Sequence, residues 1–153
     1  MKFSNLFSYS TLLFLTLSTA LMLTGCGNPA GSDEEEHPRP VGIVLQMNGA
    51  EIVRYENQEV TGQIEVNTGE ETALITLYFL DENGDQFQYD EPEYSLRPHG
   101  IDESIAEIEQ HAEDGKWSFH VRGITPGTTS VVFELFHGDH GDFETPEIPV
   151  IVN

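Results

Sequence analysis

From Val41 to the end of the chain, apolar residues recur at every second position in short runs. The clearest of these runs are VTGQIEV (60–66), KWSFHVR (116–122), SVVFELFH (130–137) and EIPVIVN (147–153). In a strand, every second side chain lies on the same face. A two-residue repeat of apolar residues therefore predicts strands with one buried face. In SVVFELFH the inward row is Val131, Phe133 and Leu135, and it ends on His137.

Two further features set the fold class. ALITLYFL (73–80) is apolar at almost every position, which is typical of a strand in the centre of a sheet. Asn83-Gly84 directly behind it is a strong signal for a tight turn. About seven short strands separated by turns predict an all-β fold, an immunoglobulin-like β-sandwich of antiparallel strands over residues 41–153.

One segment, residues 101–113, fits two structures. Ile101, Ile105 and Ile108 have helical spacing, and Asp102 stands where a helix cap would stand. The longer stretch Ser104 to Leu135, however, resembles the second half of bacterial immunoglobulin-like (BIG, invasin-type) domains. The matching residues are Ser104, Ile105, Ala106, Ile108, Gly115, Gly123, Gly127, Thr128, Thr129, Val131 and Phe133. The resemblance implies a strand at 104–109 instead of a helix.

The sandwich order then assigns the strands and the loops. Strands B to G are expected at 73–80, 86–90, 104–109, 116–122, 129–137 and 147–152. In this topology the B–C, D–E and F–G loops meet at one end of the sandwich.

The N-terminus has the layout of an export signal. Lys2 precedes an apolar run from Leu12 to Leu23, which predicts a signal peptide at residues 1–25. The following LTGC, with Cys26 as the only cysteine, resembles the lipobox of bacterial lipoproteins. That resemblance implies a lipid on Cys26 and an anchored chain that does not span the membrane. Gly27 in place of the family's retention residue, Asp, favours the outer membrane if the source is Gram-negative.

Residues 26–40 join this anchor to the domain. Their Gly, Pro, Ser and acidic residues cannot bury apolar surface, so they predict a flexible acidic tether. All 27 acidic residues follow the signal, with five of the six basic ones, so the net charge of that part is 5 minus 27, or −22. Such a charge repels nucleic acid and anionic head groups and attracts cations or cationic partners.

Candidate chemistry gathers in FHGDHGDF, residues 136–143. Imidazole and carboxylate groups are good ligands for zinc and copper. His137 and His140 are the expected ligands, Asp139 or Asp142 is a third ligand or an orienting partner, and His111 is the best remote candidate. The alternative is an acidic turn in which His137 caps the core and His140 is solvated.

Other chemistry finds little support. DENGDQ begins like a calcium loop, but Gln86 and Pro92 stand where the motif requires Gly and Glu, so a turn is favoured. The chain shows no nucleophile elbow and no phosphate-binding glycine loop, which argues against an enzyme. Two functions stay open: a lipid-anchored envelope module that binds Zn²⁺ or Cu²⁺, and a structural or adhesive envelope lipoprotein that contacts another envelope protein.

The anchor gives the first testable prediction. Cys26→Ser removes the sulfur that the lipid would modify, so the variant should keep its signal and take up no labelled fatty acid. Metabolic labelling with a radioactive fatty acid checks this. Label that still enters the serine variant would contradict the lipid anchor.

Overall fold

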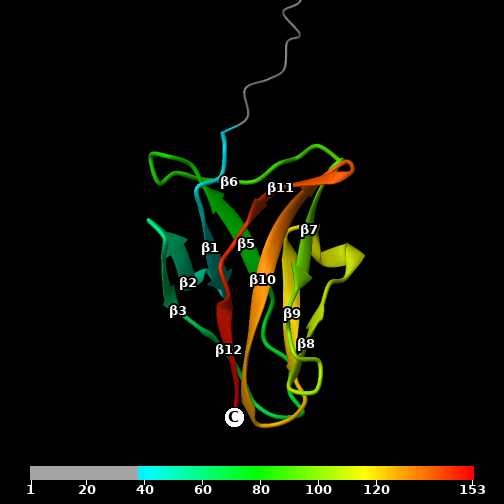
Figure 1. Ribbon diagram of the computed structural model, residues 1–153. Helices are drawn as coiled ribbons and strands as arrows, with labels where there is room; N and C mark the ends of the chain where they lie inside the picture. The colour runs from blue at the N-terminus through cyan, green and yellow to red at the C-terminus, as the bar shows by residue number, and fades with distance from the viewer. Residues whose placement is uncertain (1–37) are drawn as a thin grey trace, which may run out of the picture. The chain divides into compact units, whose positions relative to one another are not determined.

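A computed structural model describes residues 38–153, which belong to one compact unit. The unit is built of strands in two sheets that face each other, with one short 3₁₀ helix among the described residues (Figure 1). The predicted signal peptide, Cys26 and most of the tether lie outside the described residues. The end of the tether, from residue 38, lies inside them, and Pro38 accepts a hydrogen bond from the hydroxyl of Tyr89 at 2.8 Å.

The larger sheet has the order β3-β2-β1-β5-β9-β8, with β6 added to β5. Its strands are β1 Gly42–Met47, β2 Ala50–Glu56, β3 Glu59–Gly62, β5 Ile75–Leu80, β6 Gln86–Phe87, β8 Ala106–Glu109 and β9 Ser118–Gly123. The apolar strand β5 lies between β1 and β9, so its backbone is paired on both edges, as its composition predicted.

The smaller sheet has the order β11-β10-β12-β4, with β7 also paired to β10. Its strands are β4 Ile64–Val66, β7 Tyr94–His99, β10 Gly127–His137, β11 His140–Glu144 and β12 Ile148–Val152. Strand β10 runs for 11 residues. Its first half pairs with β12, and its second half pairs with both β7 and β11.

This arrangement is the predicted immunoglobulin-like sandwich. One sheet carries strands A, B, E and D as β1, β5, β9 and β8, and the other carries C, F and G as β7, β10 and the pair β11–β12. Strand β4 runs parallel to β12, at the end of the G strand. The all-β fold class is therefore confirmed. The described residues form 12 strands where about seven were predicted, because the last strand is divided into β11 and β12 and because β2, β3, β4 and β6 are additional.

Two strand predictions are wrong in detail. Residues 86–90 do not form strand C, because only Gln86–Phe87 pair, and they pair with β5, while β7 takes the C position against β10. VTGQIEV is not one strand, because Gly62 adopts a left-handed φ of 83° and the chain passes there from one sheet to the other. A Cβ at Gly62 would lie 2.1 Å from the carbonyl oxygen of Ile52, so glycine is required at this crossing.

The ambiguous segment 101–113 contains a turn followed by a strand. Asp102 caps a single turn, since its carboxylate accepts from the Ser104 amide at 3.0 Å and its carbonyl accepts from the Ala106 amide at 3.0 Å. Strand β8 then pairs with β9, so a strand is present from Ala106 onward, and the helical reading was wrong. The only helix among the described residues is η1, Ala112–Asp114.

The core lies between the sheets and is made by the predicted alternating rows. The buried members of these rows include Trp117, Phe119, Val121, Val131, Phe133, Leu135, Ile148, Val150 and Val152. Phe79 from β5 meets Trp117 edge to face, with ring centroids 5.1 Å apart. Within residues 38–153, no helix has the length and apolar character that crossing a membrane requires.

Close packing at Gly123 gives a second prediction. A Cβ there would meet the carbonyl oxygen of Asn67 at 2.5 Å and the side chain of Val152 at 2.9 Å. Gly123→Ala should therefore lower the free energy of unfolding by about 1–3 kcal/mol. Gly127→Ala is the matched control, because its Cβ would meet only the side chain of Ile105 at 3.4 Å. Equal urea midpoints for the two variants would contradict the close packing around Gly123.

Candidate metal centre

The two histidines of FHGDHGDF lie opposite each other on a tight hairpin. Gly138 and Asp139 form the two-residue turn between β10 and β11, and Gly138 has a φ of 59°. Glycine with positive φ at the first turn position is the pattern of a type II′ turn. The register pairs His137 directly with His140, and residues directly opposite in an antiparallel pair share one face of the sheet. The hairpin therefore brings together two imidazoles that a flat strand would have pointed apart.

On its other edge, β10 holds His137 against an aromatic stack. The register pairs His137 with Tyr94 of β7, and their rings stack at 4.2 Å between centroids and 14° between planes. Tyr94 stacks in turn on Tyr89 at 4.1 Å. Burial raises the pKa of Tyr89 to about 12, so this ring stays neutral. Because His137 is 34% exposed at the end of the buried row, its ring orientation is fixed while its edge stays accessible.

Asp142 completes a group of three ligands. Its carboxylate spans the two rings, with Oδ1 2.9 Å from His140 Nε2 and Oδ2 3.4 Å from His137 Nδ1. One ligand atom from each of His137, His140 and Asp142 lies within 4.8 Å of the others. Ligands about 2.1 Å from a tetrahedral zinc ion are about 3.4 Å apart, so small side-chain rotations would close the group around an ion.

Asp139 lies beside this group and orients one of its members. Its Oδ1 is 3.0 Å from His140 Nδ1, which turns His140 Nε2 toward Asp142. The same hydrogen bond is the largest cause that raises the pKa of His140 above its ordinary 6.5, with the charge of Asp142 next. Asp139 thus has the place of an orienting partner, the second of the two roles that the sequence suggested for it.

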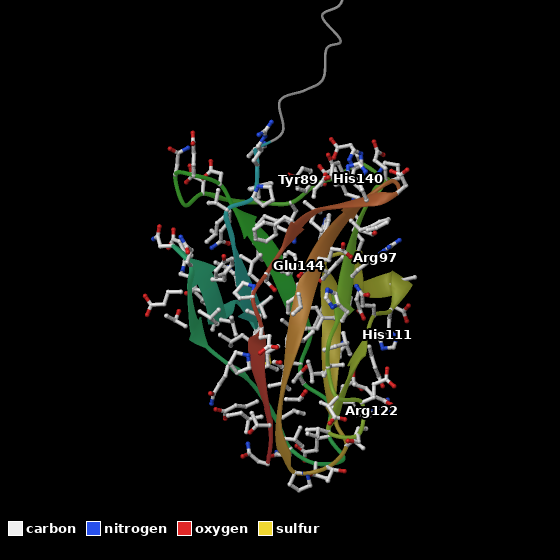
Figure 2. The ribbon with its side chains drawn as sticks, in the orientation of Figure 1. Tyr89, Arg97, His111, Arg122, His140 and Glu144 are labelled. Carbon is white, nitrogen blue, oxygen red and sulfur yellow. The ribbon has the colours of Figure 1, made fainter. Side chains whose placement is uncertain are left out.

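His111 is not in this group. The B–C, D–E and F–G loops do meet, since Trp117 Nε1 donates to Tyr89 O at 2.9 Å and the Gly138 amide donates to Glu93 O at 3.1 Å. His111, however, lies two residues after the end of β8, at the far end of the D–E loop, and its nearest acidic partner is Glu109. Figure 2 shows His111 beside the short helix, well away from His140 at the hairpin.

The remaining motifs take structural places. His99 ends β7 and lies 3.6 Å from a carboxylate oxygen of Glu144. In DENGDQ, Asp81 Oδ1 accepts from the amides of Asn83 and Asp85 at 2.9 and 2.8 Å, which is the tight turn expected there. The hydrogen bond from Asp85 is the main cause that lowers the pKa of Asp81.

Sequence reasoning missed the two tyrosines that hold His137. Tyr89 lies in the predicted strand C at 86–90, but Tyr94 lies after it, so the place of Tyr94 opposite β10 was not visible. An aromatic residue paired with a histidine across two strands leaves no local signal in either strand. Only the register of β7 and β10 would have revealed it.

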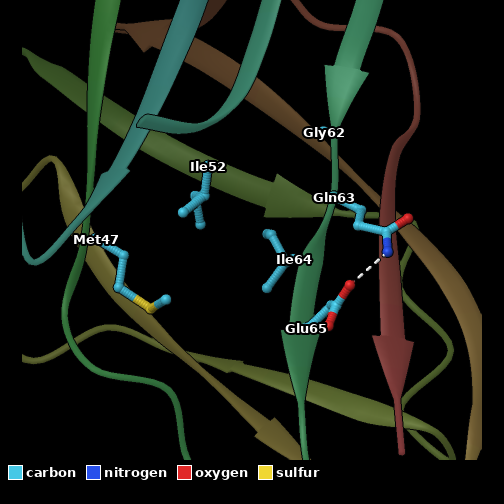
Figure 3. Close-up of a pocket in the computed structure, with 6 residues that line it drawn as sticks. All are labelled: Met47, Ile52, Gly62, Gln63, Ile64 and Glu65. Atoms are coloured by element: carbon cyan, nitrogen blue, oxygen red, sulfur yellow. Dashed lines mark hydrogen bonds between the residues drawn. The ribbon is translucent and has the colours of Figure 1, made fainter. Parts of the chain in front are cut away.

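A separate cavity of about 490 Å³ lies between β2, β3 and β4 (Figure 3). Its lining residues are Met47, Ile52, Gly62, Gln63, Ile64 and Glu65. It opens where the chain changes sheets at Gly62, and none of its lining residues belongs to the ligand group.

Comparison with solved structures shows a distant likeness. No protein family matches the chain, and no curated protein is similar to it in sequence. Domains 4 and 5 of the S-layer protein SbsC, a solved crystal structure, are similar with a TM-score of 0.43 and 16% identity. The match covers 74% of this chain and 53% of that one, so this chain spans about half its length. A likeness at this score carries no conclusion about function.

The His140–Asp139 contact gives a third prediction. Asp139→Asn removes the negative charge that favours the imidazolium, so the pKa of His140 should fall toward 6.5. A pH titration of the histidine ring signals by NMR measures this directly. His99 serves as the internal reference, and a titration curve for His140 that does not move would contradict the contact.

Proposed function

We propose that the chain is a lipid-anchored cell-envelope binding module whose β10–β11 hairpin takes a divalent transition metal, Zn²⁺ or Cu²⁺. The observation that carries the proposal is the convergence of His137, His140 and Asp142 within 4.8 Å. Two imidazoles and one carboxylate suit Zn²⁺ and Cu²⁺ better than Ca²⁺ or Mg²⁺, which prefer oxygen ligands alone.

The surroundings of the ligands support binding. Tyr94 fixes the ring plane of His137, which reduces the side-chain freedom that this ligand loses when an ion binds. Asp139 and Asp142 place two carboxylates beside the imidazole rings, and a divalent ion would balance their charge. Accessible ring edges let the ion enter and leave without opening the core.

A binding role fits the site better than catalysis. His140 and Asp139 are 61% and 99% exposed, and the cavity at β4 is lined by none of the ligands. A catalytic zinc ion needs a shaped, water-excluding pocket for its substrate beside the open coordination position. The exposed face of a hairpin is better suited to capture an ion or pass it to a partner.

The anchor and its place in the envelope belong to the same proposal. They rest on the LTGC sequence at Cys26 and the acidic segment that follows it. A lipid at Cys26 would hold the folded unit near the outer membrane, within the distance that the tether can span. The alternative, a structural or adhesive lipoprotein, uses the same anchor and sandwich, and its histidines need bind nothing.

Thermal unfolding of the purified full chain with Zn²⁺ tests the proposal and separates it from the alternative. At a hundredfold excess over Kd, an ion bound only by the native state adds about 2.7 kcal/mol, a rise in Tm on the order of 10 °C. The rise should fade as the pH falls, beginning above pH 6.5, because the raised pKa of His140 makes protons compete with the ion there.

The variants locate the effect. His140→Ala should remove most of the Zn²⁺ response and leave the stability without metal nearly unchanged, because the side chain is 61% exposed. His137→Ala should also cost stability without metal, since it loses the stack on Tyr94. His99→Ala, an exposed histidine outside the group, is the matched control. A full Zn²⁺ response in His140→Ala, or an equal response to Mg²⁺, would contradict the proposal. Either result would show that the ions are attracted diffusely by the acidic surface.

A further inference from the structure

A second cluster of ligand atoms lies at the β8–β9 edge of the larger sheet. Glu109 ends β8, His111 follows it at the start of η1, and Glu71 comes from the segment that precedes β5. One ligand atom from each of these three residues lies within 4.8 Å of the others. From this geometry we propose that Glu71, Glu109 and His111 form a second divalent transition-metal site, separate from the hairpin.

The backbone fixes the positions of these residues. Glu109 is paired with His120 across β8 and β9, and an isolated bridge joins Glu71 to Arg122. Main-chain pairing thus holds Glu71 and Glu109 on opposite sides of β9. In Figure 2, His111 and Arg122 lie along this edge, and His140 lies apart from both at the end of the smaller sheet.

Each carboxylate is held by a neighbour that leaves room for an ion. Glu109 Oε1 accepts from Arg122 Nη2 at 2.6 Å, and Glu71 Oε1 lies 3.1 Å from His120 Nδ1. Such partners orient ligands and keep their second oxygen directed at the ion. Glu109 is only 20% exposed, so its carboxylate has little freedom to turn away.

The gap beside His111 has the size of a shared ion. His111 Nε2 is 3.8 Å from Glu109 Oε2, which is too long for a hydrogen bond. It is close to the separation of about 3.4 Å between two ligands of one zinc ion. His111 makes no capping hydrogen bond to η1, so its ring has no competing backbone role.

The charge balance also favours a divalent ion. Glu71, Glu109 and Asp114 are three carboxylates around His120 and His111, and Arg122 balances one of them. A divalent cation would add positive charge beside the other two carboxylates. With a single imidazole among its ligands, this site should bind Zn²⁺ more weakly than the hairpin does.

An ion here would join the sheet edge to the chain before β5. Strand β8 is the last strand of its sheet among the described residues, so its outer edge has backbone groups without a partner strand. Linking Glu71 to Glu109 and His111 would tie that edge to the chain beside β9. The expected role is structural, in contrast to the accessible hairpin site.

Equilibrium dialysis of the full chain against Zn²⁺, with excess Mg²⁺ to occupy the diffuse acidic surface, tests the second site by stoichiometry. The unmodified chain and His99→Ala should each bind two equivalents. His111→Ala and His140→Ala should each bind one, and the double variant should bind none. Glu71→Gln, which keeps the size of the side chain, should also bind one.

The result that overturns the second site is two equivalents retained in both His111→Ala and Glu71→Gln. The hairpin proposal fails separately, if His140→Ala keeps two equivalents while His111→Ala loses one. Ring signals of His111 that shift only with the second equivalent in an NMR titration would place the weaker ion. If His111 does not respond to Zn²⁺, the edge cluster is an ion-pair network alone.

Discussion

The site depends on one constraint, the register of β10 with its two neighbours. That register sets His137 opposite Tyr94 on one edge and opposite His140 on the other. Because side chains alternate along a strand, a slip of one residue would turn the row Val131, Phe133 and Leu135 out of the core and His137 with it. The free energy of burying that row therefore fixes the position of the candidate ligands as well. Core and site are specified by the same alternation.

The sequence predicted what alternation and turn chemistry control. The inward rows of β9, β10 and β12 are buried as expected, and the apolar strand β5 is central. The errors arose where the presence of a partner strand determines whether a segment forms a strand. QFQY at 86–89 reads locally as a strand, yet only two residues find a partner, and Gly62 divides a run whose apolar spacing continues unbroken. Local spacing carries no record of which edge is free to pair.

The ligand groups show the same division between local and distant information. A two-residue turn with glycine first is readable in the sequence, and it implies that His137 faces His140. The partners of His111 could not be predicted from the sequence. Glu71 lies 40 residues earlier, and it is joined to Arg122 only by an isolated bridge between distant segments. Spatial neighbours of this kind follow from topology and not from spacing.

The stack behind His137 also connects the candidate site to the end of the N-terminal segment. Tyr94 lies between the rings of His137 and Tyr89, and the Tyr89 hydroxyl donates to Pro38 O at 2.8 Å. Trp117 Nε1 donates to the carbonyl of Tyr89, which anchors the middle of this series to the core. An ion that restricts the motion of His137 would therefore also restrict a series of contacts that ends at Pro38, the first described residue. The ligands therefore do not lie on an isolated loop, because the packing that orients His137 also holds the first described residues of the chain.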